Sequence, residues 1–249
     1  LTDGQLQIFE RILKRDRKRV HLTTFTQYGK SATVALGVLT RAASYPERWI
    51  IVAGREKQAK IIMGYIIEHT FDNDYTKGKL EIGGEDIERL QRERSKNRLT
   101  FRHTDGGIGE IMVLSADSRN SQAAGESLMG FGGANVILDE ASLIDDETEV
   151  KIFRMLGGFK DNFYLKIGNP FRRNHFYLDS INPDWYRLNI DYRQGIKEGR
   201  ISEDFIREAR QKPLFGILYE NEFPPAEMID EHGYVPLLDE KDLVEVVDD

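Results

Sequence analysis

The sequence predicts an α/β fold in which helices flank a mainly parallel central sheet and a small C-terminal linker or lid subdomain follows. Short apolar runs of strand length occur at residues 49–53, 136–138 and 163–167, and such runs are typical of strands buried on both faces. Helical patterns alternate with these strands, which favours a parallel sheet. Acidic or turn residues stand where the last two runs end. Because ligands of such sheets bind beyond the carboxyl ends of the strands, we expect the functional site at that edge.

The elements of the N-terminal half follow from periodicity and turn signals. Residues 19–25 are expected to form a strand. Residues 30–43 are expected to form a buried helix, because apolar side chains occur on nearly every side of it. The strand at 49–53 should lead to a helix at 56–71. Further short strands are expected at 80–82, 98–102 and 110–114, with a hairpin turn at Asp105-Gly106-Gly107.

The composition changes after Pro183, and we therefore place the core at residues 1–182. Residues 183–249 are assigned to the linker or lid subdomain and an acidic tail. Within this part, Ser202 is expected to cap a helix that runs to Arg210, and Lys212-Pro213 should end it. The acidic residues of the tail lack an alternating apolar strand that could hold them rigidly, so a solvated tail is favoured over a nuclease cluster.

Bulk properties exclude several classes of protein. The chain has 249 residues, which suffices for one large α/β domain with a satellite. It contains no cysteine, so disulfides and thiolate metal sites are excluded. No apolar run reaches the length of a bilayer span, and no membrane partner is expected. The N-terminus lacks Met and a basic-then-apolar leader, so we expect no export signal and a piece of a longer protein.

The net charge of −7 argues against a protein that coats nucleic acid over its whole surface. Any grip on DNA must be local, and a solvated helix face or loop is the simpler interpretation of each basic cluster. The histidines are scattered without metal-ligand spacing. The clusters are Lys14, Arg15, Arg17, Lys18 and Arg19, then Arg89, Arg92, Arg94, Lys96, Arg98 and Arg102, and finally Arg172-Arg173.

The segment between the first strand and the first helix predicts a phosphate-binding loop. Phosphates need backbone N–H groups at a helix N-terminus, a glycine for close approach, an ammonium group and a hydroxyl for Mg²⁺. Gly29, Lys30 and Ser31 supply the last three. The usual first glycine of this motif is replaced by Thr24. The segment reads Thr24-Phe25-Thr26-Gln27-Tyr28-Gly29-Lys30-Ser31.

Two adjacent acids end the apolar strand at 136–138. Packing does not explain them, since buried carboxylates are costly without a cation or donors. We expect Asp139 to position Mg²⁺, and Glu140 to orient and deprotonate the attacking water. The alternative is that both acids cap the next segment.

Two amides are further candidates for the same site. Asn169 ends the strand at 163–167 and could bond the γ-phosphate or the water, although a plain turn explains it equally well. Gln5 precedes the loop strand, and its amide could read the edge of adenine. Gln7 is a weaker candidate, and a solvent-facing helical glutamine is the simpler interpretation of either residue.

With these signals in order, the chain resembles the ATPase domain of the large terminase subunit of tailed bacteriophages, the motor that pumps DNA into preformed heads. The resemblance covers nearly the whole chain and rests on motifs from Gln5 to Phe223. The motifs are Gln5, Gln27-Tyr28-Gly29-Lys30-Ser31, Trp49-Ile50-Ile51-Val52-Ala53 with Gln58-Ala59, Gly125-Glu126-Ser127-Leu128-Met129-Gly130, Val136-Ile137-Leu138-Asp139-Glu140-Ala141, Gly168-Asn169-Pro170 with His175-Phe176-Tyr177, and Tyr219-Glu220-Asn221-Glu222-Phe223.

The resemblance implies a P-loop NTPase of the additional-strand, catalytic-glutamate type that uses ATP and Mg²⁺. It implies that Lys30 and Ser31 bind phosphates and Mg²⁺, Asp139 holds the metal, Glu140 is the catalytic carboxylate and Asn169 couples hydrolysis to movement. The implied partners are double-stranded DNA, the portal protein, the small terminase subunit and further copies in a ring. These meet in the host cytoplasm at the procapsid portal, while the isolated chain is expected to be a monomer.

Two departures from the family pattern stand out. Many members have an arginine where Thr26 stands, and some have one at the position of Met129, so the charge-stabilising arginine must come from elsewhere; Arg119 is our choice. The family usually adds a C-terminal RNase H-like nuclease domain, which this chain lacks, so we expect no cutting activity.

Two other functions remain open. The chain could be another nucleic-acid-dependent P-loop ATPase such as a helicase, although the residues after Pro183 are too few for the second sheet domain of a two-lobed helicase. It could also be a nucleotide-binding assembly module that does not hydrolyse, but such a module has no need of Glu140.

Overall fold

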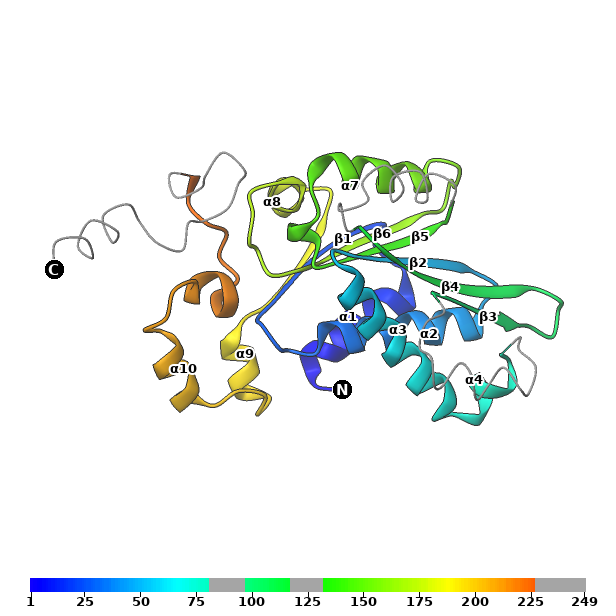
Figure 1. Ribbon diagram of the computed structural model, residues 1–249, viewed down its shortest axis with the longest axis horizontal. Helices are drawn as coiled ribbons and strands as arrows, with labels where there is room; N and C mark the ends of the chain where they lie inside the picture. The colour runs from blue at the N-terminus through cyan, green and yellow to red at the C-terminus, as the bar shows by residue number, and fades with distance from the viewer. Residues whose placement is uncertain (81–96, 117–131, 227–249) are drawn as a thin grey trace, which may run out of the picture.

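The computed structural model describes residues 1–80, 97–116 and 132–226 (Figure 1). A seven-stranded sheet in the order β3-β4-β2-β5-β6-β1-β7 forms its centre. All neighbouring strands are parallel except β3 and β4, which form the expected antiparallel hairpin. The strands are β1 (Arg19–Thr24), β2 (Arg48–Ala53), β3 (Arg98–Arg102), β4 (Ile108–Ser115), β5 (Asn135–Asp139), β6 (Phe163–Gly168) and β7 (Tyr186–Ile190).

Helices cover both faces of the sheet, which confirms the predicted α/β class. In Figure 1, α1, α2 and α3 lie against one face, α7 and α8 lie against the other, and α9 and α10 lie beyond one end. The helices are α1 (Asp3–Lys14), α2 (Lys30–Ser44), α3 (Glu56–Phe71), α4 (Asp74–Gly78), α7 (Asp146–Phe153), α8 (His175–Ile181), α9 (Tyr192–Lys197) and α10 (Glu203–Ala209), with single turns at Ala141–Leu143, Arg154–Leu156 and Gly216–Glu220.

The apolar strands are buried on both sides because their side chains alternate between the two faces. On β2, Trp49 and Ile51 pack with the helices of the α1–α3 face, whereas Ile50 and Val52 join the cluster of the opposite face. Each of these four side chains is fully buried. A continuous apolar run is the pattern that such a two-faced strand requires.

Strand β6 lies between β1 and β5, so an additional strand separates the strand before the phosphate-binding loop from the strand that ends in acids. The register pairs Thr23 with Gly168 and Asp139 with Ile167. The carboxyl ends of β1, β5 and β6 therefore lie side by side at one edge, and the loops that follow them converge there.

The N-terminal helix α1 was not predicted as an element, although the sequence carries a signal for it. Thr2 caps the helix and Gln5 completes a capping box with it. Ile8 and Ile12 lie one turn apart, are fully buried and belong to the α1–α3 face. The burial of these two side chains holds α1 against α2, with which it packs.

The sheet extends beyond the boundary expected at Pro183, because β7 pairs in parallel with β1. Its sequence alternates between buried or partly buried apolar residues and exposed polar ones, which suits an edge strand. Ser202 caps α10 through the backbone N–H of Phe205, as predicted. Of the strand expected at 80–82, Leu80 forms a single bridge to Phe101, and the remainder lies outside the described residues, as does the acidic tail from residue 227.

Across the described ranges, no helix combines the length and apolar character needed to cross a membrane.

Candidate nucleotide-binding site

The loop between β1 and α2 has the backbone geometry of a tight turn into a helix. Gln27 and Gly29 have φ angles of 60° and 89°. A Cβ on Gly29 would lie 2.9 Å from Nε2 of Gln5, so both the positive φ and the space require glycine here. The amides of Phe25 and Thr26 donate to the carbonyls of Ile190 and Leu218. Backbone groups from the C-terminal part of the chain therefore hold the loop in place.

Tyr28 anchors the loop from within. Its side chain is fully buried, and its hydroxyl donates to Oε2 of Glu198 at 2.7 Å. Its carbonyl accepts from Nε2 of Gln5 at 3.0 Å and from Arg200 at 3.1 Å. Burial and the bond to Glu198 raise the pKa of Tyr28 far above its usual range. The Gln5 amide also accepts from the backbone N–H of Thr2, so Gln5 supports the loop, and its contact with adenine stays a prediction.

Lys30 meets Glu140 across the sheet edge. Nζ of Lys30 lies 2.6 Å from Oε1 of Glu140. Burial lowers the pKa of Lys30, but the charges of Glu140 and Asp139 outweigh burial, so the pKa is raised and the ammonium stays charged. Glu140 itself has a φ of 53°, in the left-handed region. This conformation is uncommon for a residue with a side chain and is often found at functional sites.

Asp139 is fully buried and bonded on one oxygen only. Its Oδ2 accepts from Oγ of Ser31 and from Nε2 of Gln58, both at 3.0 Å. Burial and the neighbouring charge of Glu140 raise the pKa of Asp139 to about 6, against the lowering effect of Lys30 and the two hydrogen bonds. Neither Oδ1 of Asp139 nor Oε2 of Glu140 has a hydrogen-bond partner among the described residues.

These unpartnered oxygens fit a divalent cation. A buried carboxylate oxygen without a donor is costly, and a hydroxyl and a carboxylate are ligands that Mg²⁺ accepts. In the described part of the chain no group of three or more His, Cys, Asp or Glu could enclose a metal. Mg²⁺ often keeps only one or two protein ligands beside phosphates, so Ser31 and Asp139 suffice for such a site.

Asn169 lies beside the loop, buried between two carbonyl groups. Its Nδ2 donates to the carbonyl of Thr24 at 2.8 Å and to that of Leu218 at 3.5 Å. The backbone carbonyl of Asn169 accepts a hydrogen bond from Oγ of Ser142 at 2.5 Å. Asn169 therefore connects the end of β1, the segment after Glu140 and the turn at Gly216–Glu220.

The loops after β5 and β6 are further bonded to each other. Asn174 donates to the carbonyls of Ser142 and Ile144, at 3.1 and 2.8 Å. The Nε2 atom of His175 lies 3.0 Å from the carbonyl of Ile144. Burial and the nearby Lys166 ammonium lower the pKa of His175 to about 4, so this contact is made by a neutral imidazole that donates through Nε2–H.

Gln58, for which no role was predicted from the sequence, lies in the site. It lies in the first turn of α3 and donates to both Ser31, at 3.0 Å, and Asp139. The helix after β2 begins at the same sheet edge as Asp139 because Ala53 at the end of β2 pairs with Asp139. Of the other loop candidates, Thr24 ends β1 and Phe25 and Thr26 follow it, and their contact with nucleotide stays a prediction; Arg119 and Met129 lie outside the described residues.

Because β6 separates β1 from β5 and Lys30 meets the paired acids at their shared edge, the chain has a P-loop-like α/β fold with an additional strand between these two. The family described as terminase large subunit, T4likevirus-type, N-terminal, matches residues 26–208. The chain belongs to this terminase family.

Solved structures of terminases share the fold. The ATPase domain of the Thermus phage P74-26 large terminase matches with a TM-score of 0.71 at 22% identity, over 90% of this chain and 94% of that one. A second large terminase, from another thermophilic bacteriophage and in complex with ATP-gamma-S, matches with a TM-score of 0.64 at 11% identity, over 92% and 56%. The large terminase of bacteriophage HK97 gives 0.63 at 15% identity, over 90% and 50%.

The chain thus spans nearly all of the P74-26 ATPase domain but only about half of the other two terminase chains. At these identities the likeness establishes the fold. No curated protein sequence matches the chain.

Proposed function

We propose that this chain binds ATP and hydrolyses it to ADP and phosphate, and that hydrolysis powers the translocation of double-stranded viral DNA into a procapsid. One observation carries the proposal: Lys30 and Ser31 of the loop contact Glu140 and Asp139 at the end of β5, at a single sheet edge. Family membership supports it, as does the thermophilic-phage large terminase whose structure contains ATP-gamma-S.

In this proposal the phosphates lie at the N-terminus of α2. The backbone N–H groups there have no intrahelical partners and carry a partial positive charge. The Lys30 ammonium adds the charge needed for the β- and γ-phosphates. Bound Mg²⁺, held by Ser31 and Asp139, would neutralise charge on the phosphate oxygens during transfer.

Glu140 is proposed as the acceptor of the proton from the attacking water. Its Oε1 is occupied by Lys30, while its Oε2 has no hydrogen-bond partner among the described residues. When the triphosphate enters, its negative oxygens compete with Glu140 for the Lys30 ammonium. As Lys30 turns toward the phosphates, the carboxylate becomes free to orient a water in line with the γ-phosphate.

Asn169 is proposed to couple the site to the linker region. Its amide bonds the P-loop strand end and Leu218 together, so a shift of the loop on hydrolysis would reach the turn at Gly216–Glu220. The proposed division into a core at 1–182 and a linker or lid at 183–249 then has β7 as a shared strand.

The partners follow from the same proposal. They are DNA, the portal protein, the small terminase subunit and neighbouring copies in a ring, at the procapsid portal in the host cytoplasm. A neighbouring copy or Arg119 would supply the arginine that stabilises the transferring phosphate. In this proposal, DNA cutting belongs to the RNase H-like nuclease domain that the family usually adds.

Steady-state phosphate release with Mg·ATP tests the proposal, together with binding of a fluorescent ATP analogue. Wild type should release phosphate. Glu140→Gln should bind nucleotide without turnover, and Lys30→Ala should lose binding. Glu147→Gln is the matched control, since its exposed side chain lies on α7 away from the loop. Nucleotide binding without turnover in wild type would favour an assembly module, and unwinding of a duplex by the isolated chain would favour a helicase.

A further inference from the structure

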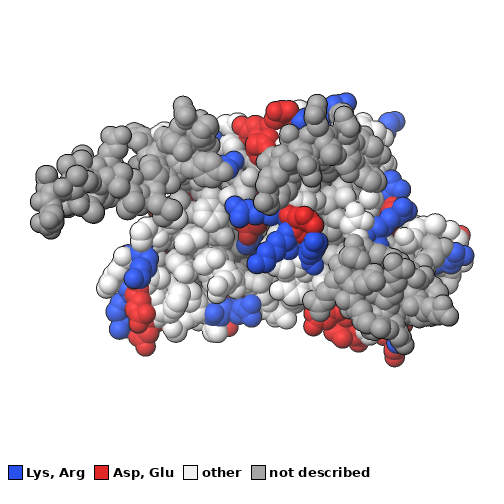
Figure 2. Space-filling model, viewed as in Figure 1, with Lys and Arg blue, Asp and Glu red and all other residues white. Residues whose placement is uncertain are grey.

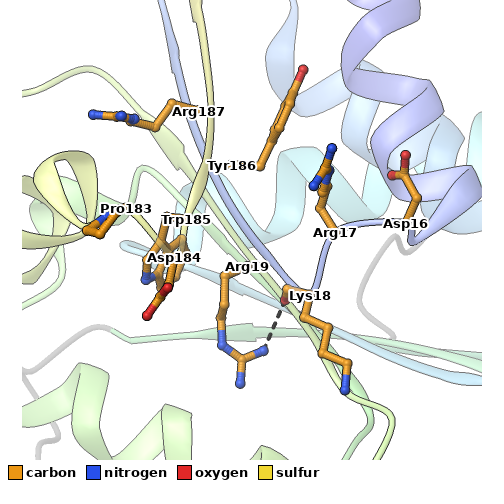
Figure 3. Close-up of a pocket in the computed structure, with 9 residues that line it drawn as sticks. All are labelled: Asp16, Arg17, Lys18, Arg19, Pro183, Asp184, Trp185, Tyr186 and Arg187. Carbon is orange, nitrogen blue, oxygen red and sulfur yellow. Dashed lines mark hydrogen bonds between the residues drawn. The ribbon is translucent and has the colours of Figure 1, made fainter.

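A polar groove lies at the edge of the sheet opposite the candidate nucleotide-binding site, where β1 and β7 begin (Figure 3). Its volume is about 580 Å³. Four cationic side chains line it, and its remaining wall includes the rings of Trp185 and Tyr186. The cations are Arg17, Lys18, Arg19 and Arg187.

The structure separates these cations from the other basic residues of the N-terminal cluster. Lys14 pairs with Glu10 at 2.8 Å. Arg15 pairs with Glu47 at 3.5 Å and with Asp161 at 3.3 Å. In contrast, none of the four groove cations forms an ion pair with a described residue. A compensated surface therefore explains Lys14 and Arg15, whereas the groove cations lack such ion pairs; among them, Arg19 donates to Oδ1 of Asn162 at 2.8 Å.

Two acids also line the groove, but they leave an excess of positive charge. Asp16 is held by Arg11, whose NH1 lies 2.9 Å from Oδ2. The second acid that lines the groove is Asp184. On the described surface visible in Figure 2, Lys and Arg instead lie among Asp and Glu in small mixed groups. An excess of cations is thus notable on a chain with a net charge of −7.

The cations are spread along the groove rather than gathered around one point. In Figure 3, Lys18 and Arg19 extend toward the lower part of the view, and Arg17 lies beside Tyr186. The side chain of Arg187 points away from these three cations. The Arg17 guanidinium lies 5.8 Å from the Tyr186 ring, and Arg187 donates to the carbonyl of Ser180 at 2.9 Å. A single small anion could meet only part of this set, whereas an extended polyanion could meet each charge in turn.

We propose that this groove binds the phosphodiester backbone of double-stranded DNA without reading its sequence. The choice of DNA over an acidic protein rests on the proposed packaging function, and on the preference of guanidinium groups for phosphate oxygens. Contacts of this kind position a protein on a duplex and carry no sequence information. Because the nucleotide site lies at the other edge of the sheet, DNA and ATP can be bound together.

Fluorescence anisotropy with a labelled duplex of mixed sequence, without nucleotide, tests the proposal. Lys18→Ala and Arg187→Ala should each weaken binding about five- to tenfold at moderate salt, and each should reduce the slope of log K against log salt by about 0.9. A duplex of different sequence should give the same losses. Lys14→Ala, which removes a neighbouring but paired lysine, should bind like wild type.

Three results would overturn the proposal: a wild-type chain with no affinity for the duplex, groove variants that bind like wild type, or groove-dependent binding of poly-glutamate that exceeds binding of DNA. Neither substituted side chain touches the nucleotide site, so phosphate release without DNA should be unchanged. Loss of turnover in wild type, with groove-dependent DNA binding intact, would refute the ATPase proposal and leave the groove assignment standing.

Discussion

Nζ of Lys30 lies 2.6 Å from Oε1 of Glu140, so the lysine proposed to hold phosphates is bound to the carboxylate proposed to activate water. The pair is well shielded from solvent, with side-chain exposures of 11% and 22%. Each partner therefore satisfies a charge that would otherwise be costly to bury. In the proposed mechanism nucleotide separates the two, so their contact offers a test of that mechanism.

Glu140→Gln should bind ATP at least as tightly as wild type and hydrolyse it about 10²- to 10⁴-fold more slowly. The neutral amide holds Lys30 less firmly, and it cannot accept a proton from water. Single-turnover hydrolysis and nucleotide titration measure the two effects separately. Weaker ATP binding in Glu140→Gln than in the Glu147→Gln control would contradict the competition between phosphate and carboxylate for Lys30.

Gln58→Ala should weaken Mg²⁺-dependent ATP binding about tenfold, as is typical when a residue that orients metal ligands is removed. The Gln58 amide donates to both Ser31 and Asp139, so its loss leaves them free to separate. Titration with ATP in Mg²⁺ and in EDTA measures the effect, which should vanish in EDTA. Gln211→Ala, at an exposed position, is the control, and equal losses with and without Mg²⁺ would argue for a merely structural role.

Asn169→Ala should lower the free energy of unfolding by about 1–3 kcal/mol, because the buried carbonyl of Thr24 loses its donor. Urea unfolding measures this change, with the exposed Asn97→Ala as control. The coupling role makes a separate prediction. In wild type, nucleotide should alter the hydrogen exchange of the turn at Gly216–Glu220, and in Asn169→Ala this response should disappear.

The stability of the chain should fall as the pH is lowered, in part through His21. This side chain is buried on β1 with its ring 4.1 Å from that of Phe176, and burial lowers its pKa to about 3. The unfolded chain takes up the proton near its ordinary pKa of about 6.5, whereas the folded chain does not until far lower pH. The contribution of the neutral ring is therefore present above that ordinary value and is lost as the pH falls toward 3.

From about pH 7 to about pH 5 this one residue should cost about 2 kcal/mol of stability. Chemical unfolding at the two pH values measures the loss. His21→Phe, which keeps a ring beside Phe176, should show a smaller decrease between the same two values. An equal decrease in wild type and variant would assign the acid sensitivity to other groups, such as His175.

Much of the fold could be predicted because the buried strands of this sheet are apolar on both faces. The run at 49–53 and the helix at 56–71 appear within a residue of their expected bounds. Among the elements that were not predicted, two were missed for clear physical reasons. Helix α1 buries only a narrow stripe that includes Ile8 and Ile12, and β7 is an edge strand whose alternating pattern is half polar.

The meeting of Lys30 with the paired acids could be predicted, because both follow strands whose carboxyl ends lie at one edge of a parallel sheet. Gln58 could not be assigned in the same way, because a glutamine in a helix is usually solvated. Its role appears only when the register brings the end of β2 beside Asp139. The groove cations were visible as a cluster, but the difference between Lys14 and Lys18 depends on whether an acid lies within reach in the folded chain.

The hydrogen bonds that hold Tyr28 have a practical consequence for the design of shorter versions of this chain. Glu198 and Arg200, from the segment after β7, bond its hydroxyl and carbonyl, and Thr2 and Gln5 do so from the other end of the sequence. A version cut after β6, or one that begins at the loop strand, would lose half of these bonds and release the turn that is proposed to bind the phosphates. Minimal versions intended for nucleotide assays should therefore start before Thr2 and continue past Arg200.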